Sequence, residues 1–97
     1  MLAVMGALDE EVAHLKKDMD VLSEACHAGI EVYHGRYSGT DIALAKCGVG
    51  KVNATICTQM LIDHYGPDAM LFSGVAGGLL PNMRVGDIVV ASHLVQY

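Results

Sequence analysis

Three short, uninterrupted apolar runs constrain the fold of this chain more than any other feature: Leu2 to Met5, Ala69 to Phe72, and Ile88 to Ala91. Glycine, serine or aspartate borders each run. A continuous apolar run of this length is typical of a strand that is buried on both faces, as in the parallel sheets of α/β proteins. We therefore expect all three runs to be strands in the interior of a sheet.

Two segments between these runs have the pattern of helices. The first is expected to begin with Asp9 as its N-terminal cap and to continue to about Asp18. The second is expected from about Lys51 to Tyr65, and Gly66-Pro67 should end it. Its apolar side chains recur at every fourth position, at Val52, Ile56 and Met60.

A hairpin is expected between the two helices. Residues from Ile30 to Tyr37 alternate between apolar and polar, and Ser38 to Asp41 supply turn residues before the run Ile42 to Lys46. The order strand, helix, hairpin, helix, strand, loop, strand predicts an α/β fold with a mixed β-sheet flanked by helices in three layers. No helix follows the last expected strand, so we expect residues 1–97 to be the N-terminal portion of one domain whose C-terminal half is absent.

Composition excludes several classes of function. The formal net charge is -5 and no basic cluster is present, so nucleic acid is not an expected partner. No apolar stretch is long enough to span a membrane, and the N-terminus lacks the features of a secretory signal. The chain has three cysteines, Cys26, Cys47 and Cys57, without CxxC spacing, and its five histidines lack metal-ligand spacing. A cytoplasmic protein without a bound metal is expected.

The first candidate site is the segment Gly6-Ala7-Leu8-Asp9-Glu10-Glu11-Val12. Acidic residues here follow a buried strand directly, and the carboxyl ends of strands in open α/β sheets are where ligands bind and catalytic groups collect. The commoner role of acids at a helix start is only to stabilise the helix dipole, by about 0.3 to 1 kcal/mol each, and the acids at positions 9–11 fit that role too. The pattern alone leaves both interpretations open.

Two glycine-rich loops are further candidates. The loop Ser73-Gly74-Val75-Ala76-Gly77-Gly78 has almost no side chains, so a ligand could lie against its backbone N–H groups, although a tight packing turn is an equal alternative. It lacks the GxGxxG spacing of dinucleotide-binding loops. The segment Gly48-Val49-Gly50-Lys51 does not match a Walker loop, because GxxxxGK[ST] is not satisfied. It is either a turn close to a ligand or a plain turn.

Taken in order, VMGALDEEV, ALAKCGVGKVNA, LFSGVAGGL and RVGDIVVAS resemble the nucleoside phosphorylase and hydrolase superfamily, specifically its 5'-methylthioadenosine/S-adenosylhomocysteine nucleosidase branch. The resemblance runs from about Leu2 to Tyr97. It implies hydrolysis of the N-glycosidic bond to adenine and a 5-thio-substituted ribose, with no metal or organic cofactor. It also implies a homodimer, which we expect to form through the helix from Lys51 to Tyr65.

The resemblance further implies roles for individual residues. Glu11 matches the glutamate that activates the attacking water. The positions that match substrate-binding positions are Leu8, Val49, Val75, Ala76 and Gly77. Val75 replaces a serine or threonine that the family often has between the glycine and the alanine of this loop. The general acid for adenine N7 and the residues that bind the ribose hydroxyls would lie beyond this sequence.

Three alternatives remain at this stage. A futalosine-type nucleosidase or a purine or uridine nucleoside phosphorylase would share the fold, although no arginine for phosphate lies in the SGVAGGL loop. A non-catalytic binding module would result if residues 1–97 acted alone, because Glu11 supplies a base but no acid is present for N7.

The isolated polypeptide of residues 1–97 is therefore expected to release no adenine from methylthioadenosine and not to stay monomeric. Its apolar strands would lack cover and expose unpaired backbone, a known route to aggregation. Expression of these residues, followed by an adenine-release assay and light scattering, tests both expectations. Monomeric, active protein would contradict them.

Overall fold

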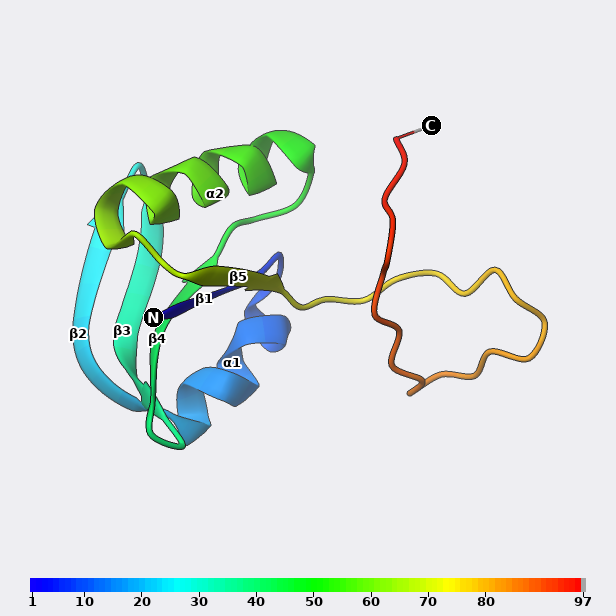
Figure 1. Ribbon diagram of the computed structural model, residues 1–97, viewed down its shortest axis with the longest axis horizontal. Helices are drawn as coiled ribbons and strands as arrows, with labels where there is room; N and C mark the ends of the chain where they lie inside the picture. The colour runs from blue at the N-terminus through cyan, green and yellow to red at the C-terminus, as the bar shows by residue number, and fades with distance from the viewer. Residues whose placement is uncertain (97) are drawn as a thin grey trace.

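The computed structural model describes residues 1–96 of the chain, and Tyr97 lies outside the described residues. Within these described residues, seven elements follow one another (Figure 1). In order they are β1 (Leu2–Gly6), α1 (Asp9–Asp18), β2 (Asp20–His27), β3 (Ile30–Tyr37), β4 (Thr40–Lys46), α2 (Lys51–Tyr65) and β5 (Ala69–Phe72). Among the described residues, no helix has both the length and the apolar character that crossing a membrane requires.

The strands form one mixed five-stranded sheet in the order β2-β3-β4-β1-β5. β1 is parallel to β4 on one side and to β5 on the other, whereas β2, β3 and β4 are antiparallel neighbours. The expected strand at the start of the chain is therefore confirmed, as are both helices and the β3-β4 hairpin. Ala69–Phe72 is also a strand, but the expectation that it lies in the interior of the sheet is wrong. β5 is at the edge of the described sheet with β1 as its one described neighbour, and Leu71 and Phe72 are 53% and 51% exposed. Ser38 and Gly39, both with positive φ, form the two-residue turn of that hairpin.

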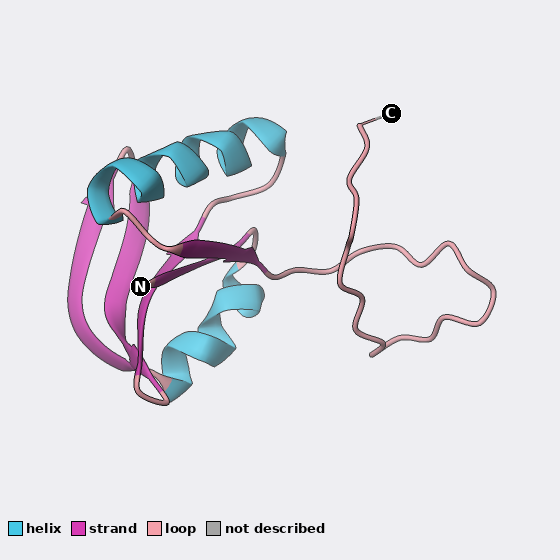
Figure 2. Ribbon diagram, in the orientation of Figure 1, coloured by secondary structure: helices cyan, strands magenta, loops and turns pink. Residues whose placement is uncertain are grey.

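The two helices lie on opposite faces of the sheet, which gives the expected three layers (Figure 2). Because side chains alternate along a strand, neighbouring residues of β1 serve different faces: Ala3 and Met5 pack beneath α2, and Val4 packs beneath α1. The α2 side is centred on Val32, Ala43, Ala45, Cys57, Met60 and Leu61. The α1 side is centred on Val12, Met19, Ile42 and Leu44. β1 is therefore covered on both faces, as its composition predicts.

β2 is a strand that the sequence pattern did not reveal. All of its residues except His27 are exposed, so it is an edge strand with no apolar stripe. Its pairing with β3 shifts register between Val21 and Ser23, as at a β-bulge. Gly35 of β3 lies opposite this irregularity, where a Cβ atom would collide with the carbonyl oxygen of Asp20. The absence of a side chain at position 35 therefore allows the edge strand to pair.

The expected strand from Ile88 to Ala91 is wrong. The structure has no helix or strand between residues 73 and 96, and this part of the chain extends away from the sheet (Figure 1). Ile88 is 92% exposed and Val90 is 90% exposed. An apolar run becomes a strand only where a neighbouring strand satisfies its backbone hydrogen bonds, and no described strand pairs with this one.

Truncation of Leu61 should destabilise the fold far more than truncation of the adjacent Ile62. Leu61 is fully buried between α2 and the sheet, whereas Ile62 is 47% exposed. Leu61→Ala should lower the free energy of unfolding by about 2 to 5 kcal/mol. Chemical denaturation of the two variants measures the difference, and equal effects would contradict the packing described above.

Candidate active site

The carboxyl ends of β4, β1 and β5 meet at one edge of the sheet. Parallel pairing continues just past the strands, because Cys47 N–H donates to the Gly6 carbonyl at 2.8 Å and Ser73 N–H donates to the Met5 carbonyl at 2.9 Å. The β1-α1 turn and the loops that begin at Gly48 and Gly74 therefore leave the sheet side by side. This edge is where open α/β sheets bind ligands.

Glu11 turns back from the first turn of α1 to this edge. Its Oε2 accepts hydrogen bonds from the N–H groups of Ala7, at 2.7 Å, and Leu8, at 2.9 Å. Its Oε1 accepts a third from the N–H of Val75, at 3.3 Å. Residues 64 positions apart in the sequence are thus joined through one carboxylate.

The start of α1 explains this conformation and corrects one expectation. The N-terminal cap is Leu8, in an extended conformation, rather than Asp9. Leucine has no side-chain acceptor, so Glu11, three residues on, accepts the N–H of the cap residue as in one half of a capping box. Asp9 is instead the first helical residue and forms an ion pair with Lys46 at the end of β4, at 2.9 Å. The helix start is therefore attached to two neighbouring strands.

Backbone hydrogen bonds determine the electrostatics of Glu11. Donation from Leu8 N–H is the largest influence and lowers the pKa of the carboxyl group, and Ala7 and Val75 act in the same direction. Partial desolvation opposes them without reversing the direction. Hydrogen bonds to the charged form always favour that form. Glu11 is accordingly an anion at neutral pH.

Gly6 provides the space for this turn. A Cβ atom at Gly6 would lie 2.8 Å from Cγ1 of Val12 and 3.1 Å from Cβ of Glu11. Any larger residue would therefore push α1 away from the end of β1. The glycine between a buried strand and an acidic helix start is thus required by close packing.

The structure brings the expected site residues together only in part. Leu8 and Val75 meet Glu11 through their N–H groups, while their side chains are 39% and 89% exposed. Val49 lies in the loop between β4 and α2, where its carbonyl accepts a hydrogen bond from Nδ2 of Asn53 at 2.7 Å. Ala76 and Gly77 follow Val75 in an open, exposed loop.

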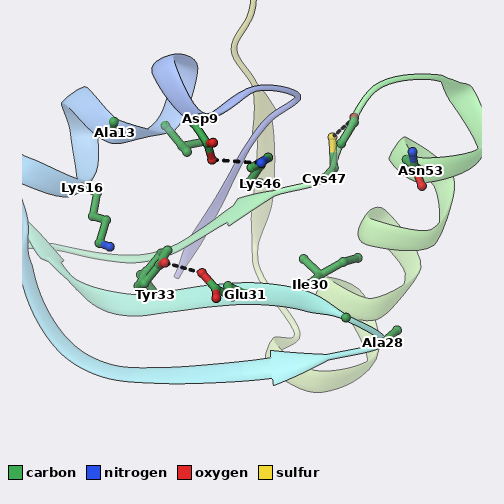
Figure 3. A pocket seen from close by; sticks show the side chains of 13 residues that line it. Asp9, Ala13, Lys16, Ala28, Ile30, Glu31, Tyr33, Lys46, Cys47 and Asn53 are labelled. Atoms are coloured by element: carbon green, nitrogen blue, oxygen red, sulfur yellow. Dashed lines mark hydrogen bonds and ion pairs between the residues drawn. The ribbon is translucent and has the colours of Figure 1, made fainter.

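A hollow of about 690 Å³ lies beside this site, between α1 and the ends of β3 and β4 (Figure 3). Asp9 and Lys46 form one wall, and Glu31 accepts a hydrogen bond from the Tyr33 hydroxyl at 2.6 Å. The ammonium of Lys16 lies 3.9 Å from the centre of the Tyr33 ring. The sequence analysis did not predict that these charged and aromatic side chains line one hollow. The one signal for it was the polar face expected of the strand from Ile30 to Tyr37. Glu11 does not line the hollow.

The sequence shows which proteins share this arrangement. A model of the phosphorylase superfamily matches residues 1–97. The chain belongs to the phosphorylase superfamily. Two helices on opposite faces of a mixed sheet, with a glycine-rich loop after β5, are therefore the superfamily fold as this chain presents it.

Individual members of the superfamily match the chain closely. A protein from Geobacillus kaustophilus named 5'-methylthioadenosine/S-adenosylhomocysteine nucleosidase is 44% identical over 95 residues, which are 98% of this chain and 40% of that protein. The solved structure of a nucleosidase of the same name from Colwellia psychrerythraea, in complex with adenine, aligns with a TM-score of 0.86 at 35% identity. The alignment covers 89% of this chain and 36% of the Colwellia psychrerythraea chain.

A third member has a different name. The structure of a futalosine hydrolase mutant of Helicobacter pylori aligns with a TM-score of 0.77 at 30% identity, over 89% of this chain and 40% of its own. The chain thus spans about 40% of the length of the relatives it matches.

Protonation of Glu11 should make the protein less stable in acid. The folded-state pKa is lowered, so the carboxylate contributes stability at a pH above its unfolded pKa, and that contribution is lost as the pH falls through the folded value. Carbon-13 NMR of the carboxyl group should show titration below that of glutamate in an unstructured peptide. Glu11→Gln should weaken the acid dependence of stability, and an unchanged dependence would contradict the role of the three N–H donors.

Proposed function

We propose that this chain is part of a nucleosidase that hydrolyses the N-glycosidic bond of 5'-methylthioadenosine and S-adenosylhomocysteine. The products would be adenine and the 5-thio-substituted ribose, as in methionine and methyl-cycle salvage. One observation carries the proposal: the sheet edge where three parallel strands end holds an ionised carboxylate in a defined orientation. The names of the relatives at this identity, and the adenine bound by one of them, support the choice of substrate.

The chemistry explains why a carboxylate suits this position. Departure of adenine gives C1' of the ribose oxocarbenium character, and a nearby anion stabilises that charge. Glu11 also accepts a proton from the attacking water and so acts as general base. The backbone N–H donors keep it ionised, so that it is ready to accept that proton at neutral pH.

The substrate-binding roles extend this proposal to the surrounding loops. Val49 would contact the ribose, and Ala76 and Gly77 would lie beside the sugar and the base. Leu8 and Val75 would line the same opening, next to Glu11. All five positions belong to loops at the carboxyl edge of the sheet, which is consistent with a single substrate that lies across it.

Departure of adenine also requires an acid. Protonation at N7 makes adenine a good leaving group. We assign that acid, together with the groups that bind the ribose hydroxyls, to residues outside these 97. The proposed reaction then needs water, one base and one acid, and no cofactor, and we place the enzyme in the cytoplasm.

Futalosine hydrolysis is the second candidate function. The likeness to the Helicobacter pylori futalosine hydrolase favours it, because that enzyme's fold matches over 89% of this chain. The relatives at 44% and 43% identity, both named 5'-methylthioadenosine/S-adenosylhomocysteine nucleosidase, place it behind the first candidate. Parallel assays with methylthioadenosine, S-adenosylhomocysteine and futalosine separate the two candidates, since each predicts a different preferred substrate.

Glu11→Gln in the full-length protein should lower kcat by about 10² to 10⁴, because the amide keeps the size of the side chain but cannot accept the proton. Adenine release from methylthioadenosine provides the measurement. Circular dichroism should show that the fold persists, since the amide oxygen can still accept a backbone hydrogen bond.

Glu10→Gln is the matched control on the same turn. Glu10 is exposed, and its side chain is not among those bound to the strand ends. Its replacement should leave kcat near the wild-type value. A fully active Glu11→Gln enzyme would refute the assignment, and an equal loss in both variants would mean that the wrong acid was chosen.

We also propose that the protein is a homodimer that associates through α2. Cys57, Met60 and Leu61 bury one face of this helix against the sheet, and apolar residues remain exposed on the others. The exposed fractions are 73% for Val52, 46% for Ile56 and 47% for Ile62. Val52 and Ile56 are four residues apart and so share one face of the helix, and exposed apolar side chains grouped in this way are typical of an interface.

Sedimentation of the full-length protein at micromolar concentration should therefore show a dimer. Val52→Lys places a charge in the proposed interface and should shift the equilibrium toward monomer. Thr40→Lys adds the same charge at the exposed start of β4 and should leave the dimer intact. A wild-type monomer, or equal behaviour of the two variants, would contradict association through α2.

A further inference from the structure

Gly74 lies where the loop after β5 approaches Glu11 most closely. A Cβ atom at this position would be 3.3 Å from Oε1 of Glu11 and 3.2 Å from Cε1 of Phe72. Either contact is tighter than an ordinary van der Waals contact, and a side chain squeezed between them would have to displace one neighbour. The absence of a side chain at Gly74 therefore lets the carboxylate and the loop backbone approach each other without displacing a neighbour.

The backbone of Val75, the residue after Gly74, is close enough to bind Glu11. Val75 N–H donates to Oε1 of Glu11, whereas Ala7 and Leu8 donate to Oε2 from the opposite side. The carboxylate is therefore held between two backbone segments, one after β1 and one after β5. Gly77, three residues after Gly74, differs from Gly74 because a Cβ atom at Gly77 would meet no atom within 4 Å.

The count of donors distinguishes the two oxygens of the carboxylate. Each carboxylate oxygen has two lone pairs that can accept hydrogen bonds. Oε2 accepts two N–H groups and is satisfied, while Oε1 accepts one and keeps one acceptor position. That remaining position is the one available to a water molecule.

We propose that Gly74 is a positioning residue for Glu11: its missing side chain lets Val75 N–H hold Oε1, so that the free acceptor position of Oε1 faces the attacking water. The expected effect on kcat rests on the function proposed above. The expected effect on the hydrogen bond between Val75 N–H and Glu11 does not. The water would transfer its proton to Oε1 as its oxygen bonds to C1', and the electrons of the glycosidic bond would leave with adenine.

Few other titratable groups act on this carboxylate. Among the described residues, the Cys47 thiol just after β4 is one such group: burial raises its pKa, and the negative charge of Glu11 raises it further. That thiol is therefore neutral in the acidic range where Glu11 titrates. On α1 itself, Asp9 is paired with Lys46. Glu10, the other acid of this turn, is exposed, and none of the variants below changes it, Asp9, Lys46 or Cys47. A change in the titration of Glu11 in those variants can thus be ascribed to its backbone donors.

Gly74→Ala in the full-length protein is the first test. The added methyl group should move the carboxylate off Val75 N–H, so the Glu11 carboxyl group should titrate at higher pH by carbon-13 NMR. The acid limb of the kcat profile should move in the same direction. kcat itself should fall by roughly 10- to 100-fold with little change in KM, because a small misplacement of a catalytic group has an effect of this order.

Two further variants distinguish loss of the Val75 hydrogen bond from a general disturbance of the loop. Gly77→Ala is the control for the titration, which should be unchanged because its methyl group meets nothing. Replacement of Val75 by its α-hydroxy acid converts the amide N–H to an ester oxygen without added bulk. That change should raise the pH of the Glu11 titration even if Gly74→Ala does not fold.

Each outcome decides the inference. A Glu11 titration that stays at its wild-type position in the ester variant, or in folded Gly74→Ala protein, would overturn it. A shift in Gly77→Ala equal to that in Gly74→Ala would also overturn it, because the effect would then be that of the loop as a whole. If the wild-type protein releases no adenine, the proposed function fails, and the titration still decides whether Gly74 positions the carboxylate.

Discussion

The hydrogen-bonded pairing of β1 with a parallel strand on each side is the constraint on which the rest of the structure depends. It places this five-residue strand between two neighbours, where α1 and α2 cover its two faces, and this burial explains why the strand is apolar throughout. It also brings three strand ends to the same height, because parallel neighbours finish at the same edge. The chain can leave that edge toward a helix only through Gly6, where a Cβ atom would strike Val12.

Glu11 combines a structural and a chemical property in one side chain. As the residue that accepts the N–H of the helix cap, it stabilises the start of α1; as an anion at the edge of the sheet, it can stabilise positive charge on a ligand. The two properties pull against each other, because every N–H that fixes the carboxylate also makes it a weaker base. Three donors fix the orientation of the carboxylate but leave one acceptor position on Oε1. That oxygen can therefore still accept a proton.

Local patterns predicted most of the fold. β1, α1, the β3-β4 hairpin, α2 and β5 have apolar periodicity or turn residues that neighbouring positions alone reveal. β2 was missed because an edge strand exposed to solvent needs no apolar stripe. The run from Ile88 to Ala91 was misjudged because its composition indicates a strand, while pairing depends on a neighbour that composition does not describe.

The candidate site was predictable to a similar degree. An acidic helix start after a buried strand is visible in the sequence, but the pattern does not choose among its three acids, and Glu11 was selected through the family resemblance. Its donors could not be predicted, because Ala7, Leu8 and Val75 contribute main-chain N–H groups that every residue except proline possesses. Because main-chain N–H groups hold the carboxylate, its position depends little on which side chains the donor residues carry. The exposed side chains at positions 8 and 75 can change, and so alter which ligands fit beside Glu11, while the main-chain N–H groups keep the carboxylate in place.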